Sequence, residues 1–342
     1  MFAVYVSNAE SGDISVLRLD PANASLTPVQ TLPIGGELMP MALSPKRDRL
    51  YAARRTEPRE ALSFAIDAKT GELAPLGAGP LAHSMAYIAT DRSGRWLFSA
   101  SYGGNLVAVN AIDERGIVKG IEQIEATGPN AHAILADETN GYVFSTSLGG
   151  GVVQQFRFDA EAGRLTPNTP ATLQPHAGAS PRHFRFSTDQ RFVYLLGELD
   201  GMVDVLGFDA ATGTLAPLQS ISSLTPDFSA QIQAQPWAAD LQLTPNGRFI
   251  YTSERRSSML TAFSVDAASG RLSLLGHTPT EAQPRGFAIT PDGRFLISVG
   301  QLSQRVRLFA IEAQTGALSA CGDARVGRGA NWVECLSLQS KD

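Results

Sequence analysis

Short runs of apolar residues, separated by polar turns, follow one another along the whole chain. The stretch 183–196 is typical: Phe184 and Phe186 alternate with polar residues, a polar turn follows, and an apolar run extends from Phe192 to Leu196. Alternation with a period of two indicates a strand with one buried face, and a continuous short apolar run indicates a strand buried on both faces. The pattern therefore predicts strand, turn and strand here, and an all-β protein if it recurs.

Two short phrases recur along the chain. An acidic residue, a turn and then Leu or Ile, as in DAKTGEL, occurs in seven copies that begin at residues 20, 67, 113, 159, 209, 266 and 312. A second phrase, as in TPNGRFIY, precedes six of these copies and ends at Tyr51, Phe98, Phe144, Tyr194, Tyr251 and Ile297, with spacings of 47, 46, 50, 57 and 46 residues. The acidic residue follows each of these ends by 15 or 16 residues, so both phrases belong to one repeating unit.

Each unit accommodates four short strands in about 40 to 50 residues, which is typical of a β-propeller blade. Seven units predict a seven-bladed β-propeller with four antiparallel strands per blade, and residues 1–342 as a single domain. The first unit lacks a leading strand, whereas the last is followed by a spare one, NWVECLSL at 331–338. We therefore expect the C-terminal strand to complete the first blade and close the ring, which removes open sheet edges.

Composition narrows the choice of partner. The formal net charge is -5 at pH 7, which argues against a nucleic-acid or anionic-membrane surface because both need an excess of Lys and Arg. The N-terminal stretch MFAVYVSNAESG has neither a basic segment nor a long apolar core, so we expect a cytoplasmic protein. Cys321 and Cys335 are too few for a disulfide framework and are expected to be buried thiols.

The repeat register predicts which side chains meet at one mouth of the central channel. In a propeller the innermost strand of each blade lines the channel, and the loops before the first strand and after the second strand open on the same face. Two positions, 12 residues before and 4 residues after each phrase end, therefore project onto one mouth. The polar residues at these positions are Arg55, Tyr102, His132, Arg182, Glu198, Arg255, Arg285 and Gln301.

Four arginines in this ring favour an anionic ligand, because guanidinium groups that converge on one cavity repel each other unless an anion is present. His132 and Glu198 each offer a candidate base. Arg182 occupies the same repeat position as His132 in the next unit, and it belongs to the same unit as Glu198. His183 follows Arg182 on an alternating strand, so we expect it on the opposite face in a packing role. The spacing of the other histidines is not that of zinc ligands, and no calcium loop is evident, so no metal or other cofactor is expected.

The stretches GPNAHAILADETNGYVFSTSL and ASPRHFRFSTDQRFVYLLGELDGMVDV, together with the segment from Trp237 to Phe309, resemble the seven-bladed propeller lactonase family. The resemblance covers essentially the whole chain. It implies hydrolysis of an anionic sugar lactone, with 6-phosphogluconolactone as the first expectation. A fungal carboxymuconate lactonizing enzyme is similar in fold, and its proposed site matches His132, Arg182 and Glu198.

The resemblance and the residue ring imply the same chemistry. His132, Arg182 and Glu198 are the expected catalytic residues: His132 or Glu198 would act as the base, and Arg182 would contact the developing oxyanion or a substrate carboxylate. The remaining five would bind the substrate: Arg55, Tyr102, Arg255, Arg285 and Gln301. Another sugar-acid lactone, a muconate-type lactonization and a ligand-binding propeller without turnover remain alternatives. A small-molecule partner and a monomer are expected, with a dimer as the alternative.

Overall fold

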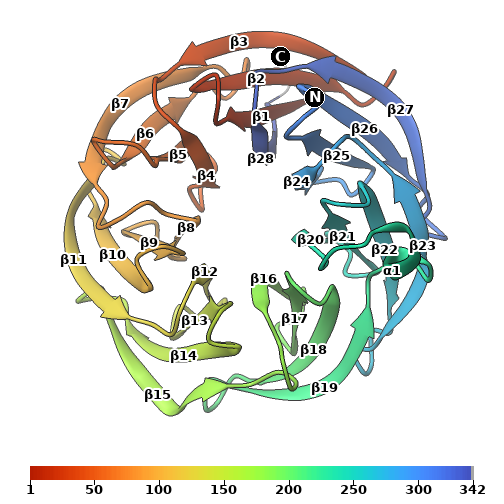
Figure 1. Cartoon of the computed structure of the whole chain (residues 1–342). Helices are drawn as coiled ribbons and strands as arrows, with labels where there is room; N and C mark the ends of the chain where they lie inside the picture. Colours follow the sequence, from red (N-terminus) through yellow and green to blue (C-terminus); the bar gives the residue numbers. More distant parts are fainter. Residues whose placement is uncertain (340–342) are drawn as a thin grey trace.

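Seven four-stranded antiparallel sheets form a ring around a central channel in the computed structural model, which describes residues 1–339 (Figure 1). Blade 1 contains β28 (Ala330–Ser337), β1 (Phe2–Asn8), β2 (Asp13–Asp20) and β3 (Ser25–Pro33). Blades 2 to 4 contain β4 (Leu38–Leu43), β5 (Arg49–Arg54), β6 (Glu60–Ile66), β7 (Leu73–Pro80), β8 (Tyr87–Thr90), β9 (Trp96–Ser101), β10 (Leu106–Ile112), β11 (Val118–Ala126), β12 (Ala131–Ala136), β13 (Tyr142–Ser147), β14 (Val152–Asp159) and β15 (Arg164–Leu173). Blades 5 to 7 contain β16 (Pro181–Phe186), β17 (Phe192–Gly197), β18 (Met202–Asp209), β19 (Thr214–Ser222), β20 (Ala238–Leu243), β21 (Phe249–Glu254), β22 (Met259–Val265), β23 (Leu272–Pro279), β24 (Pro284–Ile289), β25 (Phe295–Gly300), β26 (Arg305–Ile311) and β27 (Leu318–Arg325).

The ring closes through the two ends of the chain, as predicted. Strand β28 pairs antiparallel with β1, from Phe2 opposite Ser337 to Asn8 opposite Ala330. The two termini therefore lie side by side in blade 1 (Figure 1). The seven-bladed architecture and its closing strand are thus confirmed.

The recurring acidic phrase forms the turn between the third and fourth strands of a blade. In blade 2, the carboxylate of Asp67 accepts hydrogen bonds from the backbone N–H groups of Lys69 and Thr70, at 2.9 and 2.7 Å. Gly71 closes the turn with a φ of 78°, which glycine adopts without steric cost. The repeat is therefore visible in the sequence because each blade needs the same turn.

The aromatic residues that end the second phrase lie on the second strand of their blades and pack between blades. Tyr51, Phe98, Phe144, Tyr194 and Tyr251 are all 0–1% exposed. Tyr251 also donates a hydrogen bond of 2.7 Å to the carbonyl oxygen of Gly316 in the acidic turn of blade 7. These residues join neighbouring sheets, so the apolar core extends around the ring.

The inner strands have irregular register at the end that enters the channel. The pairing with the second strand shifts between Leu38 and Met41, Ala131 and Ile134, Pro181 and Phe184, Ala238 and Leu241, and Pro284 and Gly286. Such bulges redirect side chains and break the strict alternation of faces. The predicted positions of His132, Arg182 and Arg285 all fall within these shifts.

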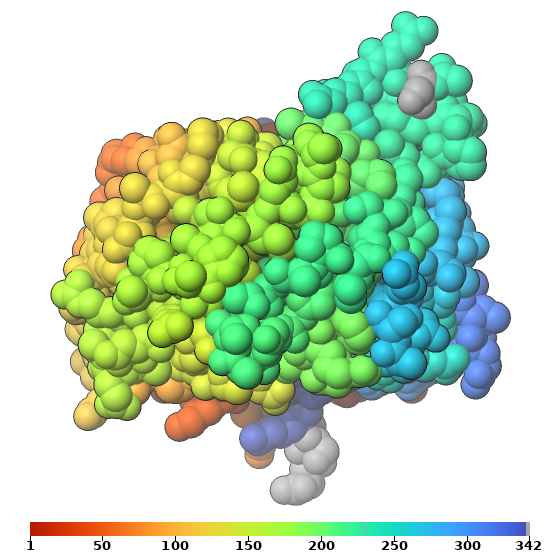
Figure 2. Space-filling model, turned by 90° about the horizontal axis from the view of Figure 1, so that it is seen from below, coloured from red at the N-terminus to blue at the C-terminus, as the bar shows by residue number. Residues whose placement is uncertain are grey.

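Blade 6 begins after the longest connection, which explains the 57-residue spacing in the sequence. The segment after β19 contains the short helix α1 (Phe228–Gln231) and leads into β20. Figure 2 shows this part of the chain, in teal, standing out from one face of the molecule.

No helix within residues 1–339 has the length and apolar character needed to span a bilayer. One prediction about the thiols is wrong: Cys335 is buried, but Cys321 is exposed because the outer strand β27 carries it.

Candidate active site

A cavity of about 490 Å³ lies at the mouth of the channel where the inner strands begin. Six of the eight residues predicted from the register line it: Arg55, Tyr102, His132, Glu198, Arg255 and Arg285. They come from blades 2 to 7, so the ring geometry converts positions that are far apart in sequence into one site. The cavity also receives Met39, His83, Ser84, Ala86, Gly103 and Trp237.

Glu198 is an acidic residue that lines this cavity, and three side chains contact its carboxylate. One carboxylate oxygen accepts a hydrogen bond of 2.6 Å from Nε of Arg182, and the other lies 3.2 Å from Arg255 and accepts a 3.0 Å hydrogen bond from Nε1 of Trp237. Burial opposes ionisation, but the two guanidinium groups outweigh it and hold the pKa of Glu198 below its ordinary value. Glu198 is therefore a carboxylate at neutral pH.

His132 lies beside this carboxylate as a neutral imidazole. Burial, followed by the positive charges of Arg182 and of His183 in its protonated form, holds the pKa of His132 well below 6.5. Its Nε2 is 3.8 Å from an oxygen of Glu198, which is too long for a hydrogen bond. Nδ1 is buried and has no hydrogen-bond partner among the described residues. Neither ring nitrogen of His132 is thus engaged in a hydrogen bond with a described residue, so the neutral imidazole keeps one nitrogen free to accept a proton.

Arg182 and Gln301 do not line the cavity. Arg182 is 1% exposed and lies behind Glu198, where its Nη1 donates to the carbonyl oxygen of Ala239. Gln301 accepts a hydrogen bond of 3.3 Å from Gln283 instead. His183 does not point away from Arg182 as expected: its Nε2 lies 3.2 Å from Nη1 of Arg182, because the bulge in β16 breaks the alternation.

The three arginines that line the cavity have different surroundings. Arg55 forms an ion pair of 3.0 Å with Glu37, and Arg255 stacks on the ring of Trp237 at 3.8 Å. The side chain of Arg285 forms no hydrogen bond or ion pair with any residue in the described range 1–339, although the charges of Glu198 and Glu37 act on it from beyond contact distance. Burial and the neighbouring arginines lower the pKa of Arg255 to about 8 and that of Arg285 to about 9. Arg285 is therefore a cation without a carboxylate in direct contact, as expected for a group that binds an anion.

Sequence reasoning missed three lining residues that shape this site. Trp237 lies in the long connection before β20, outside the repeat register, although it begins one of the segments that resemble the lactonase family. His83 and Ser84 lie just before β8: Nδ1 of His83 is 2.9 Å from Oγ of Ser101, and Oγ of Ser84 accepts a 2.7 Å hydrogen bond from Arg55. Ser84 thus links blade 3 to Arg55 of blade 2, whereas the His83 contact lies within blade 3.

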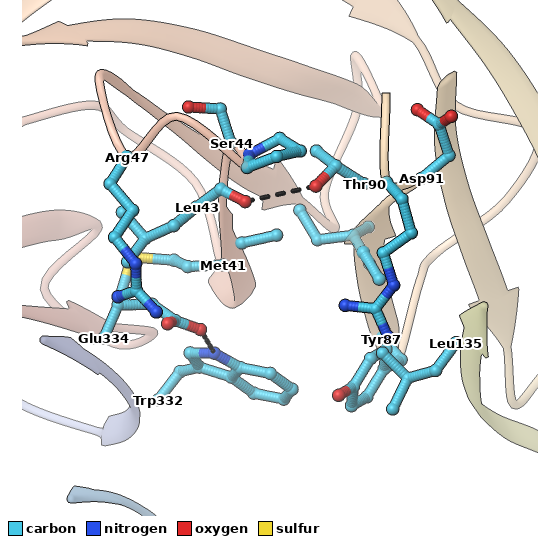
Figure 3. A pocket seen from close by; sticks show the side chains of 15 residues that line it. Met41, Leu43, Ser44, Arg47, Tyr87, Thr90, Asp91, Leu135, Trp332 and Glu334 are labelled. Carbon is cyan, nitrogen blue, oxygen red and sulfur yellow. Dashed lines mark hydrogen bonds between the residues drawn. The ribbon is translucent and has the colours of Figure 1, made fainter. Parts of the chain in front are cut away.

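A second cavity, of about 450 Å³, opens where the inner strands end (Figure 3). Trp332 donates a 3.0 Å hydrogen bond to Glu334 there, and burial raises the pKa of Glu334 to about 7. No histidine lines this cavity, and its arginines, Arg47 and Arg92, are exposed. Across residues 1–339, no cluster of three or more His, Cys, Asp or Glu side chains is arranged to hold a metal ion. The mouth with His132 and Glu198 is the better candidate for catalysis.

Two known proteins are similar to this chain over most of its length. The chain is 40% identical to the 6-phosphogluconolactonase of Pectobacterium carotovorum subsp. carotovorum over 336 residues, which cover 98% of each protein. It is also 40% identical to the 6-phosphogluconolactonase of Serratia proteamaculans over 288 residues, 84% of each protein.

Solved structures agree with the fold. The periplasmic gluconolactonase of Pseudomonas aeruginosa superposes with a TM-score of 0.90 at 27% identity, covering 99% of both chains. A Bacteroides fragilis protein described as a putative 6-phosphogluconolactonase gives 0.88 at 21% identity over 98% of both chains, which supports the fold alone. Residues 2–335 match the family described as "Lactonase, 7-bladed beta-propeller". The chain belongs to this family of seven-bladed propeller lactonases.

Proposed function

We propose that this protein hydrolyses the ester bond of 6-phosphogluconolactone to give 6-phosphogluconate, without a metal ion. The observation that carries the proposal is the cavity that combines the neutral imidazole of His132, the carboxylate of Glu198 and the unpaired guanidinium of Arg285. The names of the relatives from Pectobacterium and Serratia support the same substrate.

In the proposed reaction, His132 is the general base. A water molecule adds to the lactone carbonyl carbon while its proton passes to the imidazole, and the ring C–O bond then breaks as the proton passes to the departing ring oxygen. Glu198 has several strong donors and a lowered pKa, which make it a weak base. Its charge instead stabilises the imidazolium that forms on His132.

Arginine side chains would bind the charged parts of the substrate. Arg285 is the proposed anchor for the phosphate because no carboxylate contacts its guanidinium, with Arg55 beside the same cavity. Arg255 both fixes Glu198 and faces the cavity, so it is the proposed donor to the oxyanion. Tyr102 adds a ring 6.0 Å from that of His132, as a wall against the sugar. Gln301 does not line the cavity, so no contact with the substrate is proposed for it.

A test compares 6-phosphogluconolactone with unphosphorylated gluconolactone. We expect kcat/KM to be higher for the phosphorylated lactone after subtraction of spontaneous hydrolysis. The similarity to a periplasmic gluconolactonase favours the unphosphorylated lactone as the second candidate, and an equal or higher kcat/KM for it would support that alternative.

The proposal includes a cytoplasmic location within the pentose phosphate route, because a phosphorylated sugar does not cross membranes readily. It also includes a monomer, because β28 pairs with β1 and covers the edge that blade 1 would otherwise offer to a second chain. Cell fractionation and light scattering on the purified protein test these two points.

A further inference from the structure

A buried hydrogen-bond chain continues from Glu198 into the middle of the channel. Nε of Arg182 binds Glu198 at 2.6 Å, and Nη1 of Arg182 lies 3.2 Å from Nε2 of His183. Nδ1 of His183 then lies 2.8 Å from a carboxylate oxygen of Asp240. All four residues are buried and come from blades 5 and 6. Of these four residues, the proposed reaction uses Glu198, to which Arg182 donates a hydrogen bond.

The partners of His183 determine which of its nitrogens carries the proton. Arg182 has only N–H donors, so Nε2 of His183 must accept, and the single proton of a neutral imidazole must lie on Nδ1. Asp240 accepts that proton in a hydrogen bond. A second proton would place an N–H group and a positive charge directly against Arg182, and burial together with that charge holds the pKa of His183 well below 6.5.

Asp240 is itself fixed by two blades. The oxygen that faces His183 also accepts from the backbone N–H of Leu241 at 2.9 Å, in blade 6. The other oxygen accepts from the N–H of Phe287 at 3.3 Å, in blade 7, and from Gln242 at 3.2 Å. A carboxylate with four donors has little freedom to move, so it is a firm support for the imidazole.

From this geometry we infer that His183 and Asp240 are positioning residues that set the orientation of the Arg182 guanidinium, and through it the position of Glu198 beside His132. The inference rests on the proposed hydrolysis. It assigns these two residues an effect on turnover although neither lines the cavity. Because Arg182 does not line the cavity either, a displaced guanidinium should lower kcat and leave KM little changed.

Two substitutions of His183 distinguish positioning from packing. The ring centroid of His183 lies 5.2 Å from that of Tyr87 and 5.7 Å from that of Trp332. His183→Phe keeps an aromatic ring among these neighbours but removes the acceptor for Arg182. His183→Gln loses the ring but places a carbonyl oxygen near the former Nε2. We expect His183→Phe to lower kcat on the order of 10²-fold, as a misplaced catalytic group does. His183→Gln should recover part of this loss, and Asp240→Asn should lower kcat with an unchanged KM.

The opposite order of activity for the two His183 variants would refute the inference. If His183→Phe is as active as His183→Gln, or more so, and thermal melting shows that both proteins are folded, then His183 serves only to fill space.

Nitrogen-15 NMR of the histidine side chains supplies a readout that is independent of turnover. The neutral Nδ1–H form of His183 at pH 7 supports the inference, and an Nε2–H form or an imidazolium overturns it. A wild-type protein without lactone turnover would instead refute the proposed function.

Discussion

The charge of Glu198 is the part of the site whose removal has the most direct consequence. Glu198→Gln keeps the size of the side chain but removes the negative charge that lies 3.8 Å from Nε2 of His132. If His132 takes a proton from water, the imidazolium that forms loses this attraction. At an effective dielectric constant of about 20, two unit charges at this distance attract each other by about 4 kcal/mol.

Since each 1.36 kcal/mol corresponds to about a factor of ten in rate, the substitution should lower kcat by about 10³-fold. The substitution also leaves Arg182 and Arg255 without their common counter-charge, which costs roughly 3–5 kcal/mol of folding stability for a buried pair. The assay temperature must therefore lie well below the melting temperature of the variant. The matched variant His132→Gln should show a similar loss of kcat without the loss of the ion pairs.

Turnover can be measured from proton release, because the product acid ionises as soon as the lactone opens. Spontaneous opening is measured in parallel and subtracted. A folded Glu198→Gln protein that retains kcat within about tenfold of the wild type would refute the electrostatic role, since a charge at this distance is worth much more than that.

Three other outcomes follow from the site. Arg285→Met should raise KM for the phosphorylated lactone more than for gluconolactone, whereas Arg164→Met, which removes an exposed charge on outer strand β15, should change neither KM value. Turnover should survive prolonged treatment with a chelator; loss that calcium or zinc reverses would contradict the metal-independent proposal. The free energy of unfolding of the wild type relative to His132→Gln should fall as the pH drops below 6.5, because His132 takes up a proton in the unfolded chain at a pH where its lowered pKa keeps it neutral in the fold. Glu334, whose pKa is raised to about 7, acts in the opposite direction but is present in both proteins. Denaturant titrations of both proteins at several pH values test this, and the same difference in stability at pH 7 and pH 5 would contradict it.

The blade count and the circular arrangement of the site were predictable because each blade repeats the same turn. The acidic turn of Asp67 and Gly71 marks one strand end, and Tyr251 marks another at a fixed distance. Fixed distances along a strand translate directly into positions around a ring. This is why the register placed His132 and Glu198 at the same mouth.

The details that escaped prediction arise where the repeat is interrupted. Alternation predicted that His183 would point away from Arg182, but the bulge in β16 brings both side chains into the channel. Trp237 lies in a connection that no other blade shares, so no register could assign it to the cavity. The depth of Arg182 behind Glu198 depends on the radius of the channel, which strand spacing alone does not reveal.

Closure of the ring by β28 also sets the order in which the molecule can be completed during synthesis. Trp332, on this last strand, packs edge-on against Tyr87 of blade 3 and His183 of blade 5, with ring centroids 5.3 and 5.7 Å apart. Until the ribosome has released residues 330–337, a nascent chain has an unpaired edge on β1 and lacks the indole that fills the channel beside His183. The chain can build its other six blades as it emerges, but the surroundings of the candidate active site are completed only when β28 is in place.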